Sequence, residues 1–154
     1  SDTGQFCYTN DKSRSNDGLT ALGVLTFQFV GQKDSPEAKK GLIALNGAKA
    51  GYDVSPQPFY SWYYITQAKF NEQSTGWKNW NPQIAKLLVS TQAKDGHWLS
   101  PTDEKNYGPT YSPTLAALCL QVYYRLLPTF GEKALAAPVQ PAGFEDSGDV
   151  NVTL

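Results

Sequence analysis

Methionine is absent from the 154-residue chain, and histidine occurs only once. Because no methionine is present, Ser1 is not a translation start, and we expect the chain to be a processed form or a piece of a longer protein. The two cysteines are too few for a disulfide framework. No apolar run approaches the ~20 residues that a membrane-spanning helix needs, so the sequence predicts no such helix.

Charge is also sparse. Charged residues make up 18% of the chain, and the formal net charge is −1. Lysine and arginine are scattered rather than gathered into a patch or stripe, so the sequence predicts no nucleic-acid interface. Nothing in this composition assigns the protein to a cellular compartment.

Apolar residues, by contrast, are plentiful enough for a core. They make up 40% of the chain, and aromatic residues alone make up 13%. At this length the sequence predicts a single folded domain, or part of one, over residues 1–130. Residues 131–154 contain prolines, glycines and late acidic residues and are predicted to form an extended C-terminal tail.

Hydrophobic periodicity predicts helices over 19–30, 35–46, 59–70, 82–92 and 112–127, and connections between them. Three of these segments, 19–30, 59–70 and 112–127, are apolar on nearly all sides, which is typical of helices enclosed by others. The other two are amphipathic. Ser35-Pro36, Asn81-Pro82 and Ser112-Pro113 are each interpreted as a capping residue followed by a proline in the first turn.

Enclosed and amphipathic helices therefore alternate, and the enclosed ones recur every ~40–50 residues, the range of two-helix repeats. This order is typical of helical hairpins laid in an inner and an outer layer. Two all-α architectures satisfy it, an open α-solenoid and a closed α/α toroid.

The stretch Leu88-x-x-x-Gln92-x-x-x-Gly96-x-Trp98 resembles the QW motif of squalene–hopene and oxidosqualene cyclases. The wider pattern is similar to the prenyltransferase and squalene-cyclase repeat family and covers residues 4–130. In the QW motif the glutamine ends a helix and the tryptophan stacks back across the turn. The resemblance implies an α/α toroid, of whose ~6 hairpins this chain supplies ~2.5. It also implies a structural role for Gln92, Gly96 and Trp98.

The catalytic groups of that family are not found at matching positions. The Asp-x-Asp-Asp cluster of its cyclases is missing, and Asp146 and Asp149 lack its spacing. Asp17 occupies the place of a zinc-binding aspartate of the prenyltransferases, but Leu19 stands where their cysteine would be. One of three ligands does not make a zinc site. We therefore predict no catalytic residue, metal or cofactor in this chain.

Three other residues are given ordinary structural roles. Asp17 is interpreted as an acid at or near a helix N-cap. His97 is predicted to lie at the surface. Cys119, in an apolar helix, is predicted to be a buried free thiol, because free cysteine packs as a small hydrophobe.

Polar and aromatic residues on the enclosed helices are the candidates for a binding cavity. An aromatic-lined cavity suits an apolar or cationic guest. The alternative is that the tyrosines are ordinary core residues and that the glutamines are satisfied by helix ends. The cavity candidates are Tyr60, Tyr63, Tyr64, Gln67, Gln121 and Tyr124.

The leading hypothesis is a non-catalytic toroid segment of a larger protein that acts as a binding or interaction module. Its partner would be the remainder of its own chain or another copy completing the ring, with an apolar small molecule as a possible ligand. One alternative is part of an isoprenoid-processing enzyme whose catalytic acids lie outside this piece. Another is a helical barrel that binds or processes carbohydrate, suggested by Trp77, Trp80 and Trp98. An acidic cluster, a His/Cys/Asp set or a secretion signal in a longer sequence would distinguish these hypotheses.

Overall fold

A computed structural model describes residues 3–9 and 15–124, with side chains as far as Val122. Within these residues the regular structure is helical, and one isolated β-bridge joins Cys7 to Ser15. The α-helices are α1 (Asp17–Phe29), α2 (Pro36–Ala44), α3 (Pro58–Glu72), α4 (Thr75–Thr91) and α5 (Tyr111–Leu120). Three short 3₁₀-helices are η2 (Leu45–Gly47), η3 (Asp103–Tyr107) and η4 (Gln121–Tyr124). The all-α prediction is confirmed for this part of the chain.

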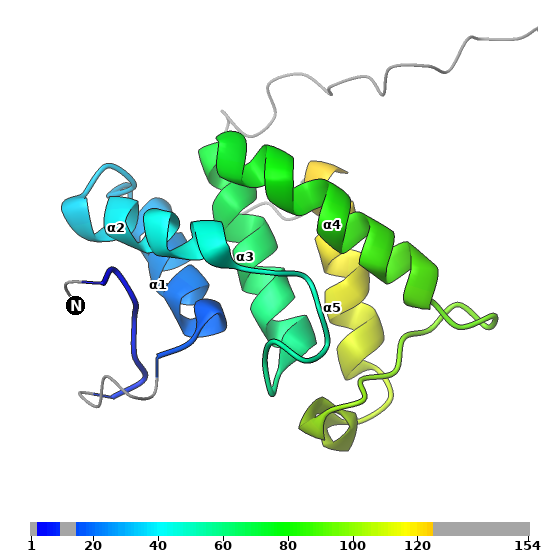
Figure 1. Ribbon diagram of the computed structural model, residues 1–154. Helices are drawn as coiled ribbons and strands as arrows, with labels where there is room; N and C mark the ends of the chain where they lie inside the picture. The colour runs from blue at the N-terminus through cyan, green and yellow to red at the C-terminus, as the bar shows by residue number, and fades with distance from the viewer. Residues whose placement is uncertain (1–2, 10–14, 125–154) are drawn as a thin grey trace, which may run out of the picture. The chain divides into compact units, whose positions relative to one another are not determined.

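The helices form two layers, which Figure 1 shows with α2 and α4 in front of α1, α3 and α5. Helix α3 is central, because it packs against α1, α4 and α5. Helix α2 packs against α1, and α4 packs against both α3 and α5. The three helices predicted to be enclosed therefore form one layer, and the two amphipathic helices lie against one side of it.

The three helices of the first layer run in the same direction. At the start of α1, Gly18 lies so close to Ser61 that an added Cβ would be 2.7 Å from its hydroxyl oxygen. At its end, Gln28 donates from Nε2 to the carbonyl of Ala68 at 2.9 Å. Helix α5 runs in the same direction as α3, because Tyr111 at its start lies near Tyr60 and Cys119 near its end lies near Thr66 (Figure 1). A parallel row of this kind needs an outer helix to return the chain between successive members.

Tryptophans fill the space between the two layers. Trp62 and Trp80 are 0% and 1% exposed, and the Trp80 indole N–H donates to Thr66 Oγ1 at 2.9 Å. Rings of Tyr52, Phe59 and Trp62 meet edge to face with centroids 4.9–5.8 Å apart. Such pairs are favoured beyond simple burial. The layers are thus held together by large aromatic side chains.

Local capping chemistry starts two of the helices, α2 as predicted and α1 through a residue that was not predicted. Ser35 accepts from the backbone N–H of Ala38, with Pro36 in the first turn, as predicted. Asn16 caps α1 by accepting from Leu19 N at 2.8 Å. Asp17 is therefore the first residue of α1 rather than its cap, in keeping with its interpretation as an acid near the N-cap.

The prediction for α4 is wrong at its start. Residues 71–81 were expected to connect two helices, with Asn81-Pro82 as a cap, but α4 begins at Thr75 and contains Pro82. Two features override the proline: Ser74 caps the helix through a hydrogen bond from Gly76 N, and Trp77 and Trp80 are buried along the same face as Ile84 and Leu88. The aromatic burial outweighs the single backbone hydrogen bond that a proline removes.

The prediction for the last helix also needs correction. Helix α5 begins at Tyr111, its N-cap Thr110 makes no side-chain capping bond, and the α-helix ends at Leu120 before η4. Ser112 is buried within the helix instead of capping it. The predicted continuation to 127, the boundary at 130 and the tail 131–154 lie outside the described residues.

Candidate binding face

Five tyrosines gather where α3, η3 and α5 meet, and we call them the tyrosine cluster: Tyr60, Tyr63, Tyr64, Tyr107 and Tyr111. Tyr64 is in edge-to-face contact with Tyr60 and Tyr63, with ring centroids 4.7 Å and 5.0 Å apart. Tyr107 and Tyr111 form a similar pair at 4.9 Å. The predicted candidates Tyr60, Tyr63 and Tyr64 are thus brought together.

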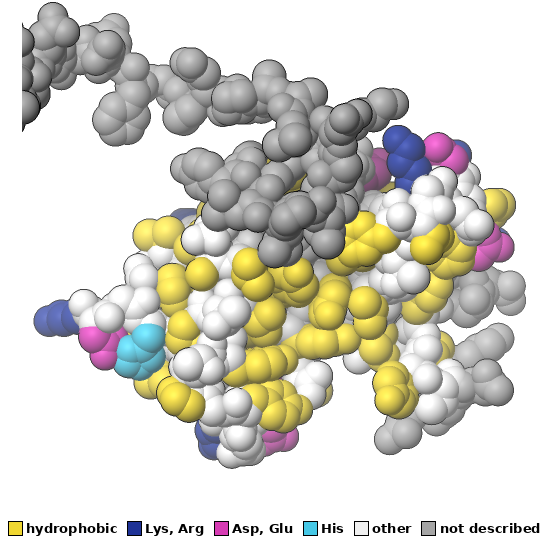
Figure 2. Space-filling model, turned by 180° about the vertical axis from the view of Figure 1, so that it is seen from behind, with side chains coloured by type: hydrophobic (Ala, Val, Ile, Leu, Met, Phe, Trp, Pro, Cys, Tyr) yellow, Lys and Arg dark blue, Asp and Glu magenta, His cyan; other side chains and the backbone are white. Residues whose placement is uncertain are grey.

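The tyrosine cluster lies on the side of α3 that faces away from α4. Thr66 and Lys69 of α3 meet Trp80 of α4. With about 3.6 residues per turn, positions 60, 64 and 67 fall on the opposite side. Figure 2, drawn from behind, shows hydrophobic side chains spread across this face of the first layer. The outer helices α2 and α4 therefore leave it uncovered.

Glu104 of η3 fixes the start of α3, from which the cluster extends. Its side chain is 0% exposed and accepts from Phe59 N at 3.1 Å, Tyr60 N at 2.9 Å and the Ser100 hydroxyl at 3.1 Å. Gln57, the N-cap of α3, makes no capping bond of its own. A carboxylate from a distant part of the sequence thus accepts hydrogen bonds from the free N–H groups of this helix. Its negative charge also lies at the positive end of the helix dipole.

Glu104 also influences the tyrosines electrostatically. Partial burial, followed by the Glu104 carboxylate and the neighbouring Tyr107, Tyr60 and Tyr64, raises the pKa of Tyr111 to about 12. Burial likewise raises the pKa of Tyr60 and of Tyr63. These hydroxyls therefore remain neutral hydrogen-bonding groups at physiological pH.

Gln67 is the polar residue at the middle of this side of α3. It is 3% exposed, and its carbonyl Oε1 is buried without a hydrogen-bond partner. A buried unpaired acceptor costs about 1–3 kcal/mol. The predicted alternative, an amide satisfied by a helix end, does not account for this oxygen.

Of the remaining cavity candidates, only Gln121 has a described side chain, and it lies apart from the cluster. Gln121 follows the end of α5 and is exposed. Tyr124 ends η4, and its side chain lies outside the described residues. No described contact connects Gln121 to the tyrosines.

The three residues of the QW-like motif form the turn after α4. Gln92 is the C-cap and donates from Nε2 to the carbonyl of Gly96 at 2.8 Å. Gly96 has φ +89°, a region that favours glycine. Trp98 is 6% exposed and donates from Nε1 to the carbonyl of Leu88 at 2.7 Å. The tryptophan thus supplies a partner to a carbonyl of the last turns of α4.

The other residues considered for chemistry lie apart. Asp17 is partly buried, and its pKa is raised by burial, an effect that the positive charge of Lys69 opposes. His97 forms an exposed contact with Asp95, with Nδ1 and Oδ1 2.6 Å apart. Cys119 is a buried free thiol, as predicted, and burial raises its pKa to about 12. Among the described residues, no three His, Cys, Asp or Glu side chains lie close enough to hold a metal ion.

Sequence reasoning missed Glu104, Tyr107 and Tyr111. They lie in a segment that was interpreted as loop. No local sequence pattern around Glu104 predicts that its carboxylate is buried. Tyr107 ends η3 and Tyr111 begins α5, so their contact depends on the turn between the two helices and has no helical spacing to predict it.

No family model, curated protein or solved structure matches the chain. The resemblance to the prenyltransferase and squalene-cyclase repeat family therefore stays a prediction. In the part of the chain that the structure describes, no helix has both the length and the apolar character needed to cross a membrane.

Glu104→Gln is expected to change how stability depends on pH. Burial raises the pKa of Glu104, although bonds from Tyr60 N, Phe59 N and Ser100 oppose the shift. A raised pKa means that the folded state holds the proton to higher pH than the unfolded state does. The stabilisation of the fold by this proton is therefore complete below the ordinary pKa of 4.5 and is lost as pH rises through the folded pKa.

The measurement is the unfolding free energy from urea titrations over the acidic pH range. The decline in unfolding free energy above pH 4.5 should be smaller in Glu104→Gln than in the wild type. Glu37→Gln is the control, because Glu37 is an exposed acid on α2. Identical pH profiles for Glu104→Gln and the wild type would show that this carboxylate does not titrate differently on folding.

Proposed function

We propose that the chain is an arc of an α/α toroid that acts as a non-catalytic binding or interaction module. In this proposal the face bearing the tyrosine cluster borders the central hollow of the ring. Further hairpins, from the same polypeptide or from another copy, complete the ring. The face binds an apolar small molecule within it.

The observation that carries the proposal is the apolar face of the first layer on the side away from α2 and α4 (Figure 2). Helices α1, α3 and α5 run side by side in one direction, and α2 and α4 lie against only one side of them. Apolar faces left open on a soluble domain commonly mark binding surfaces. A ring interior is a place where such a face is shielded from water.

The chemistry of the face favours binding of an apolar guest. The cluster offers tyrosine rings with neutral hydroxyls, and partly buried Leu115 lies one turn after Tyr111. An apolar body that carries one hydrogen-bond donor suits this set, because pockets for small molecules are mostly apolar with a few placed polar groups.

Binding rather than catalysis is proposed because of the residues that form the cluster. The described side chains there are phenols, an amide and aliphatic groups, and they include no carboxylate or imidazole that faces a guest. The Glu104 carboxylate already accepts hydrogen bonds from two backbone N–H groups and a hydroxyl. Histidine and an accessible carboxylate, the commonest general acids and bases, are therefore lacking on this face of the described helices.

Cyclohexanol, which has an apolar ring and one hydroxyl donor, is a suitable probe. We expect calorimetric titration to give saturable binding to the wild type and at least a ~10-fold loss of affinity in Tyr64→Ala, equivalent to about 1.4 kcal/mol. Tyr8→Ala is the matched control, because Tyr8 is 82% exposed and lies outside the cluster.

Equal loss in Tyr8→Ala and Tyr64→Ala, or no saturable binding to the wild type, would contradict an apolar guest site. Tetramethylammonium serves as the cationic comparison, since aromatic faces also attract cations. Tighter binding of tetramethylammonium than of cyclohexanol would replace the apolar guest by a cationic one.

A further inference from the structure

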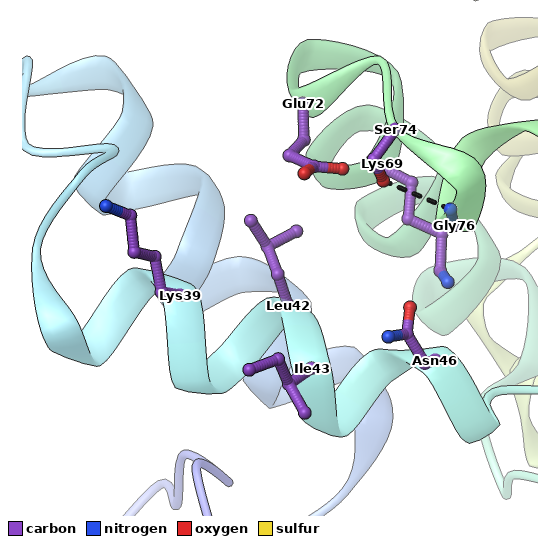
Figure 3. A pocket seen from close by; sticks show the side chains of 8 residues that line it. All are labelled: Lys39, Leu42, Ile43, Asn46, Lys69, Glu72, Ser74 and Gly76. Carbon is purple, nitrogen blue, oxygen red and sulfur yellow. Dashed lines mark hydrogen bonds between the residues drawn. The ribbon is translucent and has the colours of Figure 1, made fainter.

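A second candidate site lies where the end of α2 meets the junction of α3 and α4 (Figure 3). It is a cleft of about 260 Å³ whose walls come from α2, the end of α3 and the first turn of α4, with Asn46 of η2 at one side. This volume is below that of a typical drug-sized site. The cleft is separate from the tyrosine cluster and does not depend on the function proposed above.

Polar atoms of three residues converge in the cleft beside Gly76, at the start of α4. A Cβ at Gly76 would lie 3.0 Å from Asn46 Oδ1, 3.3 Å from Ser74 Oγ and 3.5 Å from Lys69 Nζ. Figure 3 shows the Lys69 side chain pointing towards Gly76 and Asn46. Because glycine has no side chain, three groups able to hydrogen-bond can lie close together beside the start of α4.

Lys69 is the unusual member of this group. It is 3% exposed, and among the described residues it makes neither a hydrogen bond nor an ion pair. Its ammonium lies 6.0 Å from the centroid of the Trp80 ring. Burial lowers the pKa of Lys69, while the charges of Glu72 and Asp17 oppose the shift. A buried ammonium without a hydrogen-bonded partner is costly unless an anion joins it.

The first turn of α4 adds to the attraction for an anion. Ser74 caps this 17-residue helix, so the positive end of its dipole faces the cleft. The amide of Asn46 offers either its oxygen or its two N–H donors, because the two ends are interchangeable by a flip. Lysine, amide and helix terminus together form the surroundings that proteins use for oxyanions.

We propose that this cleft binds the carboxylate of a small organic acid, held by Lys69, Asn46 and the start of α4. Lys39 and Glu72 also line the cleft, so with Lys69 its lining carries one more positive than negative charge, which a singly charged anion balances and a doubly charged anion such as phosphate exceeds. Leu42 and Ile43 line it on the side of α2. The ligand class is therefore a monocarboxylate with a short apolar body.

Butyrate is the probe, and the readout is the change in backbone amide chemical shifts during a titration. Saturable shifts are expected at Asn46, Lys69 and Gly76. Gly76→Ala should weaken butyrate binding at least ~10-fold, because its Cβ enters the space where the polar atoms converge, while alanine favours helix over glycine. Lys69→Met, which keeps the apolar stem and removes the charge, should weaken binding to a similar extent.

Gly47→Ala is the matched control, because a Cβ at Gly47 meets nothing within 4 Å. It should bind butyrate like the wild type. Unsaturable shifts, wild-type affinity in Gly76→Ala, or equal binding of 1-butanol would overturn the proposal. Tighter binding of inorganic phosphate than of butyrate would overturn the assignment of a monocarboxylate.

Discussion

Replacing Trp98 by alanine is expected to lower the free energy of unfolding by about 3–5 kcal/mol, the range for large-to-small aromatic changes in a core. The side chain is 6% exposed, and its indole donates to the carbonyl of Leu88 at 2.7 Å. The variant loses both the buried ring and the partner of a helix-terminal carbonyl. Urea-induced unfolding followed by far-UV circular dichroism measures the change.

Two further variants separate the contributions at this turn. Trp98→Phe keeps an aromatic ring and removes the N–H donor, so it should cost less than Trp98→Ala. Leu99→Ala is the neighbouring control, because Leu99 is 71% exposed. A change under ~1 kcal/mol in Trp98→Ala would mean that the turn does not hold the end of α4.

Glu104→Ala is the second variant with a large expected effect, about 3 kcal/mol of lost stability. The substitution removes a fully buried acceptor. Three donors then lose the carboxylate to which they donate: Phe59 N, Tyr60 N and the Ser100 hydroxyl. Each buried donor left unpaired costs about 1–3 kcal/mol, and water entering the cavity recovers part of the loss.

Asp103→Ala is the control for Glu104→Ala, because Asp103 is an exposed acid in the same 3₁₀-helix. Hydrogen exchange of the first turn of α3 adds a local readout, and faster exchange at Phe59 and Tyr60 is expected only in Glu104→Ala. Unchanged exchange and stability would show that Glu104 does not cap this helix.

The helices of the first layer could be predicted from sequence because each is a long apolar run, although the start signal Ser112-Pro113 did not mark the start of α5. The run from Phe59 to Phe70 is buried on most sides in α3, as its composition indicated. Helix α4 was predicted too short because Pro82 is a strong local breaker. The burial of Trp77 and Trp80 against α3 opposes it, and the helical spacing of these two residues with Ile84 and Leu88 was a local signal that the proline masked.

The candidate sites were predictable to different extents. Tyr60, Tyr63 and Tyr64 follow one another so closely that their proximity was assured on any helix. Glu104 and Lys69 were not predictable, because a charged residue is normally exposed and only the tertiary fold buries it. Gly76 was not singled out either, since its role depends on Asn46, which comes from η2.

The most direct test of the central claim is ¹⁹F NMR of protein labelled with 3-fluorotyrosine and titrated with cyclohexanol. If the uncovered face of the first layer is the binding surface, the resonances of Tyr60, Tyr63, Tyr64 and Tyr111 shift together along one saturation curve. Those of Tyr8 and Tyr52 then stay in place. Equal shifts at Tyr8 and Tyr64, or no saturable shift in the cluster, would contradict the account.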